Sequence, residues 1–149
     1  MQLPPPHAAG YSLLELVIVL VMLGMATAMA FPTVSRITTH SRVNQAAMVV
    51  AQDLSLALSA AARGRKPIRV ARGADAASIT LSERASGKLL STRWLGRGDA
   101  YGLDSIAFSV SPVDLFPSGM ASSALSVTLW SGTYSRQVTM SRAGWVRVP

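Results

Sequence analysis

The hydrophobic and polar positions divide the chain into three stretches with different periods. The first, residues 12–31, is almost continuously apolar, and Glu15 is its single charged side chain. As a helix, these roughly 20 residues would span about 30 Å, the thickness of the hydrocarbon core of a bilayer. The pattern therefore predicts a segment that can enter a membrane, with one carboxylate near its start.

The second stretch has the period of an amphipathic helix. Apolar residues recur at steps of three and four, with polar residues between them, which predicts one face for a core. These positions are Val43, Ala47, Val50, Leu54, Leu58 and Ala61. Pro32 lacks a backbone donor and should kink the rod without ending it. We expect the helix to end near Arg63 and Gly64, with the glycine as its C-cap.

The third stretch alternates with the period of β-strands and is divided by turn signals such as Ser86-Gly87 and Ala143-Gly144. The strands expected are 68–71, 78–83, 88–95, 105–110, 125–130, 135–140 and 145–148. Residues 111–123 read as a loop. A long helix whose second half packs on an antiparallel sheet is an α+β fold.

Charge follows the same division. All fourteen Lys and Arg lie from Arg36 onward with six of the seven acids, so the positive charge of the chain, +7 in all, belongs to the second and third stretches. This excess is either a footprint for a polyanion or a solvated cationic face. The sequence has no cysteine and two histidines, His7 and His40, the latter expected in solvent or at an interface. No catalytic triad, metal-ligand spacing or phosphate loop is recognisable, so we expect neither an enzyme nor a cofactor or metal.

The apolar stretch has three interpretations. A secretory signal peptide could be cut after Ala30, in the small-x-small pattern of Ala28-Met29-Ala30, but the residues before it carry no Lys or Arg. A plain transmembrane anchor leaves Glu15 unexplained, because a carboxylate costs roughly 2.5–3.5 kcal/mol near the middle of a membrane helix. The third interpretation is an assembly helix in which another chain brings the carboxylate a partner.

The stretch Gly-Tyr-Ser-Leu-Leu-Glu-Leu, from Gly10, resembles the prepilin cleavage motif of type IV pilins and type II secretion pseudopilins. The resemblance implies that a prepilin peptidase cuts after Gly10 and that Tyr11 becomes an N-methylated terminus. It also implies that Glu15 pairs with the terminal amine of a neighbouring subunit, which lowers the cost of its burial. Pro32 sits where many members have a proline. Tyr11 replaces the more usual phenylalanine, and the leader lacks the usual basic residues.

The C-terminal part is similar to the GspH/FimT group of pseudopilins, whose pattern of strand, loop, two strands and a closing glycine it follows. Phe116, Gly119, Gly144 and Arg147 occupy the corresponding places. The resemblance implies a leader at 1–10, an assembly helix at 11–32, an amphipathic helix at 33–63 and a periplasmic β-rich domain at 64–149. It further implies a minor pseudopilin of the type II secretion system in the inner membrane, near the tip of a filament of other pseudopilins, with secreted cargo as a further partner.

A basic cluster marks the junction of helix and sheet and supports an alternative function. Its residues are Arg63, Arg65, Lys66, Arg69 and Arg72. They are either solvated charges that guard an edge strand or a patch for DNA phosphates. FimT-like pilins, which take up DNA, end in Gly-Arg-x-Arg. Here Trp145 stands in place of the first arginine and Arg147 in place of the second, so DNA remains the alternative partner.

Overall fold

The computed structural model describes residues 11–149, with the side chains of all but 29–33 and 35. Helix α1 (Leu13–Gly64) is followed by β-strands, and the chain divides into two compact units at Ile37 and Thr38. The first unit is the N-terminal part of α1. The second contains the rest of α1 and two four-stranded sheets, which confirms the predicted α+β class.

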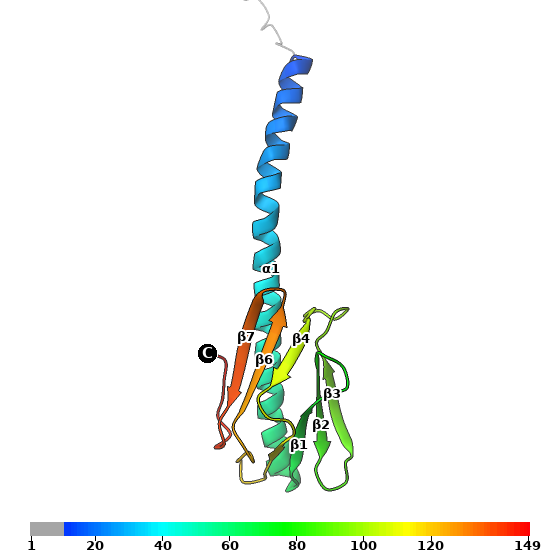
Figure 1. Ribbon diagram of the computed structural model, residues 1–149, viewed down its shortest axis with the longest axis vertical. Helices are drawn as coiled ribbons and strands as arrows, with labels where there is room; N and C mark the ends of the chain where they lie inside the picture. The colour runs from blue at the N-terminus through cyan, green and yellow to red at the C-terminus, as the bar shows by residue number, and fades with distance from the viewer. Residues whose placement is uncertain (1–10) are drawn as a thin grey trace, which may run out of the picture. The chain divides into compact units, whose positions relative to one another are not determined.

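Both sheets are antiparallel and lie over the C-terminal part of α1 (Figure 1). The first has the order β3-β2-β1-β5 and the second the order β4-β6-β7-β8. The strands are β1 (Ile68–Arg72), β2 (Ser78–Glu83), β3 (Leu89–Trp94), β4 (Ser105–Phe108), β5 (Val113–Leu115), β6 (Leu125–Ser131), β7 (Tyr134–Met140) and β8 (Val146–Arg147). The backbone N–H of Ile106 donates to the Ala76 carbonyl at 2.9 Å and links the two sheets.

The helix face predicted from the sequence forms one wall of the core. Val43, Ala47, Val50, Leu54 and Ala61 are buried, and Leu58 packs against them partly buried. The strands supply alternate residues to the same core, as in β6, whose Leu125, Val127 and Leu129 are buried. The small residues Ala46 and Ala57 complete the helix face and bring the backbone close to the sheets.

Two of the sequence expectations were wrong. Residues 111–123 contain strand β5, which pairs with β1 from Ile68 against Leu115 to Val70 against Val113. A strand of three residues, with Pro112 directly before it and Pro117 two positions after it, is too short for a period to be visible. The helix ends at Gly64, but the left-handed residue that follows it is Arg65, with φ of 51°. Gly64 is therefore not the residue in the left-handed conformation.

Polar contacts fix the sheets on the helix. Arg93 of β3 donates two hydrogen bonds of 2.8 Å to the carboxylate of Asp53 on α1. His40 stacks on Tyr134 with ring centroids 3.8 Å apart, and the Tyr134 hydroxyl donates to Asn44 Oδ1 at 3.3 Å. His40 nevertheless stays exposed, in line with the expectation that it lies in solvent or at an interface.

Candidate functional site

The start of α1 is built by Ser12 and Glu15. The backbone N–H of Glu15 donates to Ser12 Oγ at 3.2 Å, and that of Leu16 donates to the Ser12 carbonyl. Ser12 is thus the N-cap, and Glu15 occupies the third helical position, where the S-x-x-E sequence of a capping box has its glutamate. The helix dipole favours a carboxylate in this first turn. The sequence analysis missed this local reason for a glutamate, although Ser-Leu-Leu-Glu carries its signature.

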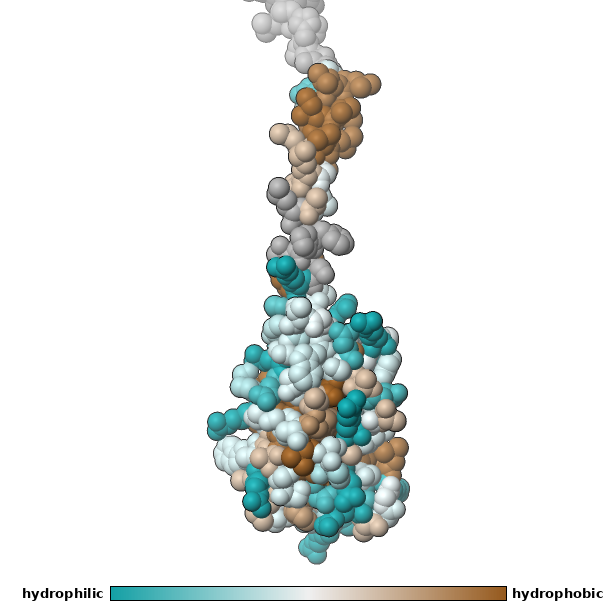
Figure 2. Space-filling model, viewed as in Figure 1, coloured by the Kyte–Doolittle hydropathy of each residue, from teal (hydrophilic) through white to brown (hydrophobic). Residues whose placement is uncertain are grey.

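The described side chains around Glu15 are exposed and apolar. From Tyr11 to Met25 the exposed fraction of the large hydrophobic side chains runs from 45% to 86%. Tyr11, Glu15, Leu16 and Val19 line a shallow groove of about 350 Å³ on one helix face. Figure 2 shows this continuous hydrophobic surface near the N-terminal end of the described helix. Within residues 11–149, no cation pairs with the Glu15 carboxylate.

Gly10 and Pro32 are the two other residues that the motif singles out in this segment. Gly10, the predicted cleavage site, lies outside the described residues. Pro32 lies within α1, which continues past it to Gly64. Its side chain is among those not described. Cleavage after Gly10 and methylation of Tyr11 therefore remain predictions from the motif.

Two parts of α1 are apolar enough to suggest a membrane helix. By length and hydropathy, Arg36–Gly64 could cross a bilayer, whereas Leu13–Ala28 is counted as a shorter apolar helix. The first already buries its apolar face in the protein core through residues such as Val43 and Leu54. The second has no protein surface over its described side chains, so a lipid or protein environment suits this segment better.

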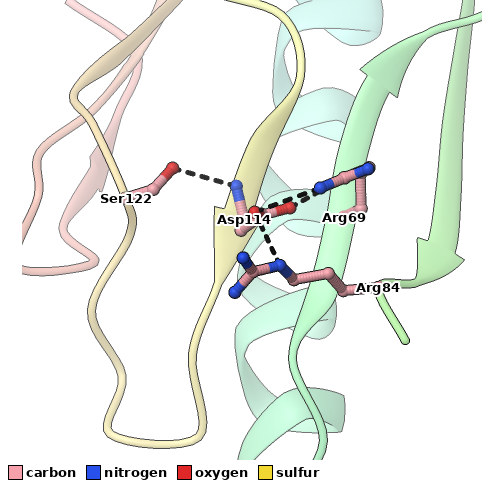
Figure 3. Close-up of polar contacts among 4 residues, drawn as sticks. All are labelled: Arg69, Arg84, Asp114 and Ser122. Carbon is pink, nitrogen blue, oxygen red and sulfur yellow. Dashed lines mark hydrogen bonds and ion pairs between the residues drawn. The ribbon is translucent and has the colours of Figure 1, made fainter.

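The basic cluster at the end of α1 is partly neutralised inside the protein. Lys66 Nζ lies 2.7 Å from Glu83 Oε1, and Arg69 donates to both oxygens of Asp114 at 2.9 and 3.3 Å. Arg84, which the sequence analysis did not select, lies 3.2 Å from the same Asp114 carboxylate (Figure 3). The Lys66 ammonium, followed by the Ser86 hydroxyl, lowers the pKa of Glu83.

The remaining cations of the cluster are exposed and form no ion pair with a carboxylate of the described residues. Arg63 and Arg65 are exposed at the end of α1, and Arg72 is exposed at the end of β1, where its backbone N–H donates to Ser111 Oγ at 3.1 Å. None of the three has a carboxylate partner among the described residues. Of the predicted cluster, Lys66 and Arg69 thus have carboxylate partners, and whether the cluster binds a polyanion stays a prediction.

Arg147 belongs to the other sheet. It lies on β8 opposite Thr139 of β7, which in turn lies opposite Ser126 of β6. Together with Trp145, whose side chain is 68% exposed, they line a groove of about 530 Å³. The structure therefore places Arg147 and Trp145 together, on a different sheet from Arg69 and Arg72.

The glycines of the C-terminal resemblance meet in space. Gly119 and Gly144 have φ of 82° and 79°. A side chain at Gly144 would collide with the Gly119 carbonyl oxygen, so the two backbones are in direct contact. Phe116 lies at the same loop under the guanidinium of Arg84, 5.9 Å from its ring centroid. This close approach seats the turn before β8 on the loop after β5.

No group of three or more metal-ligating side chains occurs among residues 11–149. The described grooves are open and lined mainly by apolar, hydroxyl and arginine side chains. What this arrangement offers is surface chemistry: an apolar helix with one carboxylate, and sheets with exposed cations.

Comparison with known proteins adds information on the fold. No protein-family model matches the sequence, and a search of curated proteins finds no match. Among solved structures, the type IV minor pilin FimU of Pseudomonas aeruginosa is similar, with a TM-score of 0.61 at 18% identity, over 75% of this chain and 91% of that one. A second crystal form of FimU gives 0.57 at 17% identity, over 71% and 91%.

The minor pseudopilin EpsH from the Type 2 Secretion System of Vibrio cholerae is also similar. Its TM-score is 0.58 at 15% identity, over 72% of this chain and 96% of that one. At such identities the likeness concerns the fold. FimU and EpsH serve different machines, so the comparison does not choose between a pilus and a secretion system. The chain has the pilin-like fold shared by a minor pilin and a minor pseudopilin, with a long N-terminal helix packed on antiparallel sheets.

Proposed function

We propose that the chain is a structural minor pseudopilin of the type II secretion system, H-like, and that its activity is assembly and not catalysis. The observation that carries this proposal is Glu15, whose carboxylate has no cation partner among residues 11–149 and stands in an exposed apolar helix. A buried carboxylate without a counter-ion is costly, so this residue needs a cation from another molecule. The pilin-like fold supports a filament as the source of that molecule.

The proposed pathway follows the prepilin motif. The segment at residues 11–32 inserts in the inner membrane, with the sheets in the periplasm. The prepilin peptidase cuts after Gly10, and the new Tyr11 amine is methylated. The apolar helix then packs among the helices of other pseudopilins near the tip of the filament. There Glu15 meets the terminal amine of a neighbour and sets the axial register, while the outer sheets contact other subunits or secreted cargo.

Three measurements test this proposal in the native host. N-terminal sequencing should begin at methylated Tyr11, and a start at Phe31 would instead identify a cleaved signal peptide. Gly10→Val should leave an unprocessed band on a gel.

Glu15→Ala should still insert in the membrane but fail to enter filaments, and Glu15→Gln serves as the isosteric control that removes the charge alone. Normal assembly by both Glu15 variants would contradict the proposal.

The second candidate is a FimT-like minor type IV pilin that captures DNA. The observation that favours it is the set of arginines without carboxylate partners in the described part of the chain, namely Arg63, Arg65 and Arg72 with Arg147 on the other sheet. A gel shift with the full chain in nonionic detergent should show retardation that weakens steeply with salt if phosphates are bound. Replacing Arg63, Arg65 and Arg72 by alanine should then abolish it.

A further inference from the structure

The turn between β7 and β8 separates two grooves on the sheet surface. On one side, Ser126, Thr139, Trp145 and Arg147 line the groove of about 530 Å³. On the other, Phe116, Met120 and Arg142 line a second groove of about 650 Å³. Trp145 lines the first groove and Arg142 the second, so the turn contributes a side chain to each.

This turn is held by its own backbone. The N–H groups of Ser141 and Gly144 donate to the carbonyls of Trp145 and Ser141, at 2.9 and 3.0 Å. The Ala121 N–H donates to the Arg142 carbonyl at 2.8 Å and joins the turn to the neighbouring loop. Gly144 rests against Gly119. A surface fixed in this way loses little conformational freedom when it binds.

The exposed side chains around the turn are those that dominate protein interfaces. Trp145 is 68% exposed and Met120 is 55% exposed, although both are large and apolar. Arg142 and Arg147 are exposed and have no carboxylate partner within residues 11–149. Tryptophan, methionine and arginine are enriched at interfaces, and tryptophan and arginine supply most of the residues whose loss costs the most affinity.

The charge around the turn indicates the kind of partner. No acidic side chain lines either groove, and each groove is lined by one arginine that forms no ion pair among the described residues. A complementary surface is therefore acidic, with apolar groups to receive Trp145 and Met120. Nucleic acid fits less well, because a strand needs a continuous row of cations for its phosphates. Here each groove is lined by a single arginine, Arg147 in one and Arg142 in the other.

We propose that this turn surface, formed by Met120, Arg142, Trp145 and Arg147, is where the chain docks on the acidic face of another pilin-like subunit. The inference rests on the proposed function, because it takes the partner to be a filament subunit. It goes further by naming the surface and the chemistry of the contact: an indole and a thioether enter apolar recesses while two guanidinium groups meet carboxylates.

The test uses the full chain in detergent micelles. Each of the other pilin-like subunits of its own genome is purified in the same detergent and titrated against it, with tryptophan emission and thermophoresis as readouts. One subunit should bind, and its affinity should fall when salt rises from about 50 to about 500 mM. Trp145→Ala, and separately Arg142→Ala with Arg147→Ala, should weaken it about tenfold or more.

A charge-matched control separates the surface from general electrostatics. Arg72→Ala with Lys88→Ala removes the same charge from the end of β1 and from the exposed residue before β3, and should change the affinity less than about twofold. Equal binding by all variants would overturn the docking surface and leave the filament function standing. Binding to no subunit would overturn the inference, and a mature N-terminus other than Tyr11 would separately overturn the proposed function. Binding of single-stranded oligothymidylate that is lost in Trp145→Ala would assign the surface to nucleic acid instead.

Discussion

Single residues at the end of α1 show how a local conformation is chosen. Arg65 adopts the left-handed conformation, and the N–H of Lys66 donates to the Ala61 carbonyl five residues back, at 3.3 Å. This is the long hydrogen bond of a Schellman motif, in which glycine normally occupies the place of Arg65. Gly64, one residue earlier, is still helical and has open space where a side chain would stand.

Substitutions at Arg65 and Gly64 should therefore change the stability in the opposite sense to that expected if Gly64 were the left-handed residue. Arg65→Gly should raise the free energy of unfolding by about 1 kcal/mol, because it removes the steric cost of a left-handed Cβ. Gly64→Ala should be neutral or slightly stabilising, since alanine favours helix. Urea unfolding of both variants checks this. A loss of about 1 kcal/mol in Gly64→Ala would mean that Gly64, and not Arg65, needs the conformational freedom of glycine.

Gly144 is a residue for which glycine is required twice. Its positive φ disfavours any side chain, and a Cβ would strike the Gly119 carbonyl oxygen. Gly144→Ala should lower the free energy of unfolding by about 2 kcal/mol or more. The atom in the way belongs to the backbone, which cannot move aside as the end of a flexible side chain can. Gly132→Ala provides the control, with φ of 59° and open space around the site, and should lose only about 1 kcal/mol. Equal losses would remove the steric argument.

Among the elements, β5 depends most on its contacts. It is a three-residue edge strand, and Asp114 at its centre binds Arg69 of β1 and Arg84 through its carboxylate and Ser122 through its N–H. The Asp114 side chain is 14% exposed. Asp114→Ala leaves two guanidinium groups without their shared partner, which costs more than the loss of a surface pair.

We expect Asp114→Ala to lower the melting temperature clearly more than Asp99→Ala does. Asp99 is exposed and forms no ion pair among the described residues, so it serves as the matched control. Hydrogen exchange should show the β5 and β1 amides, including Val113 and Val70, exchanging faster in the Asp114 variant. Similar melting curves for both variants would contradict the proposed dependence of β5 on this cluster.

The elements also show what the sequence could and could not predict. Helix α1 and the longer strands follow from their periods, because a buried face repeats over several turns or alternate residues. Strand β5 has too few residues for a period, and its place is set by pairing with β1, a contact distant in sequence. The sequence also could not show which cations of the basic cluster have carboxylate partners, for the same reason. Whether Arg69 forms an ion pair depends on Asp114, which lies 45 residues away in the sequence.

For the whole molecule, acid should weaken the sheet domain. The Lys66 ammonium and the Ser86 hydroxyl lower the pKa of Glu83, and the Gly132 N–H and Arg97 guanidinium lower that of Asp104. A carboxyl group whose pKa is lowered by folding stabilises the protein above its ordinary value, here 4.5 and 3.8. That contribution disappears as the pH falls through the lower folded-state values.

The urea midpoint should therefore be steady near neutral pH and fall below about pH 4.5. A double variant, Glu83→Gln with Asp104→Asn, should be less stable at pH 7 but lose less on acidification, because two of the groups that take up protons on unfolding are gone. The slope of stability against pH between about 5 and 3 is the quantity to compare. An unchanged slope would show that other carboxyl groups carry the acid sensitivity.

The two units of the chain differ in how they are stabilised. Every buried hydrophobic residue of the core lies between Val43 and Met140, within the second unit, whereas the described side chains from Tyr11 to Ala28 are all exposed. The second unit thus has its own core, and the first needs lipid or other chains to cover it.

A fragment beginning at Thr38 should fold alone, soluble without detergent. Its melting temperature should match that of the sheet domain in the full chain, because no core contact is lost. The full chain should need detergent, whereas the fragment should give sharp side-chain NMR signals in buffer. A fragment with helical circular dichroism but broad signals and no cooperative melting would show that residues before Thr38 contribute to the core, and that the membrane segment also supports folding.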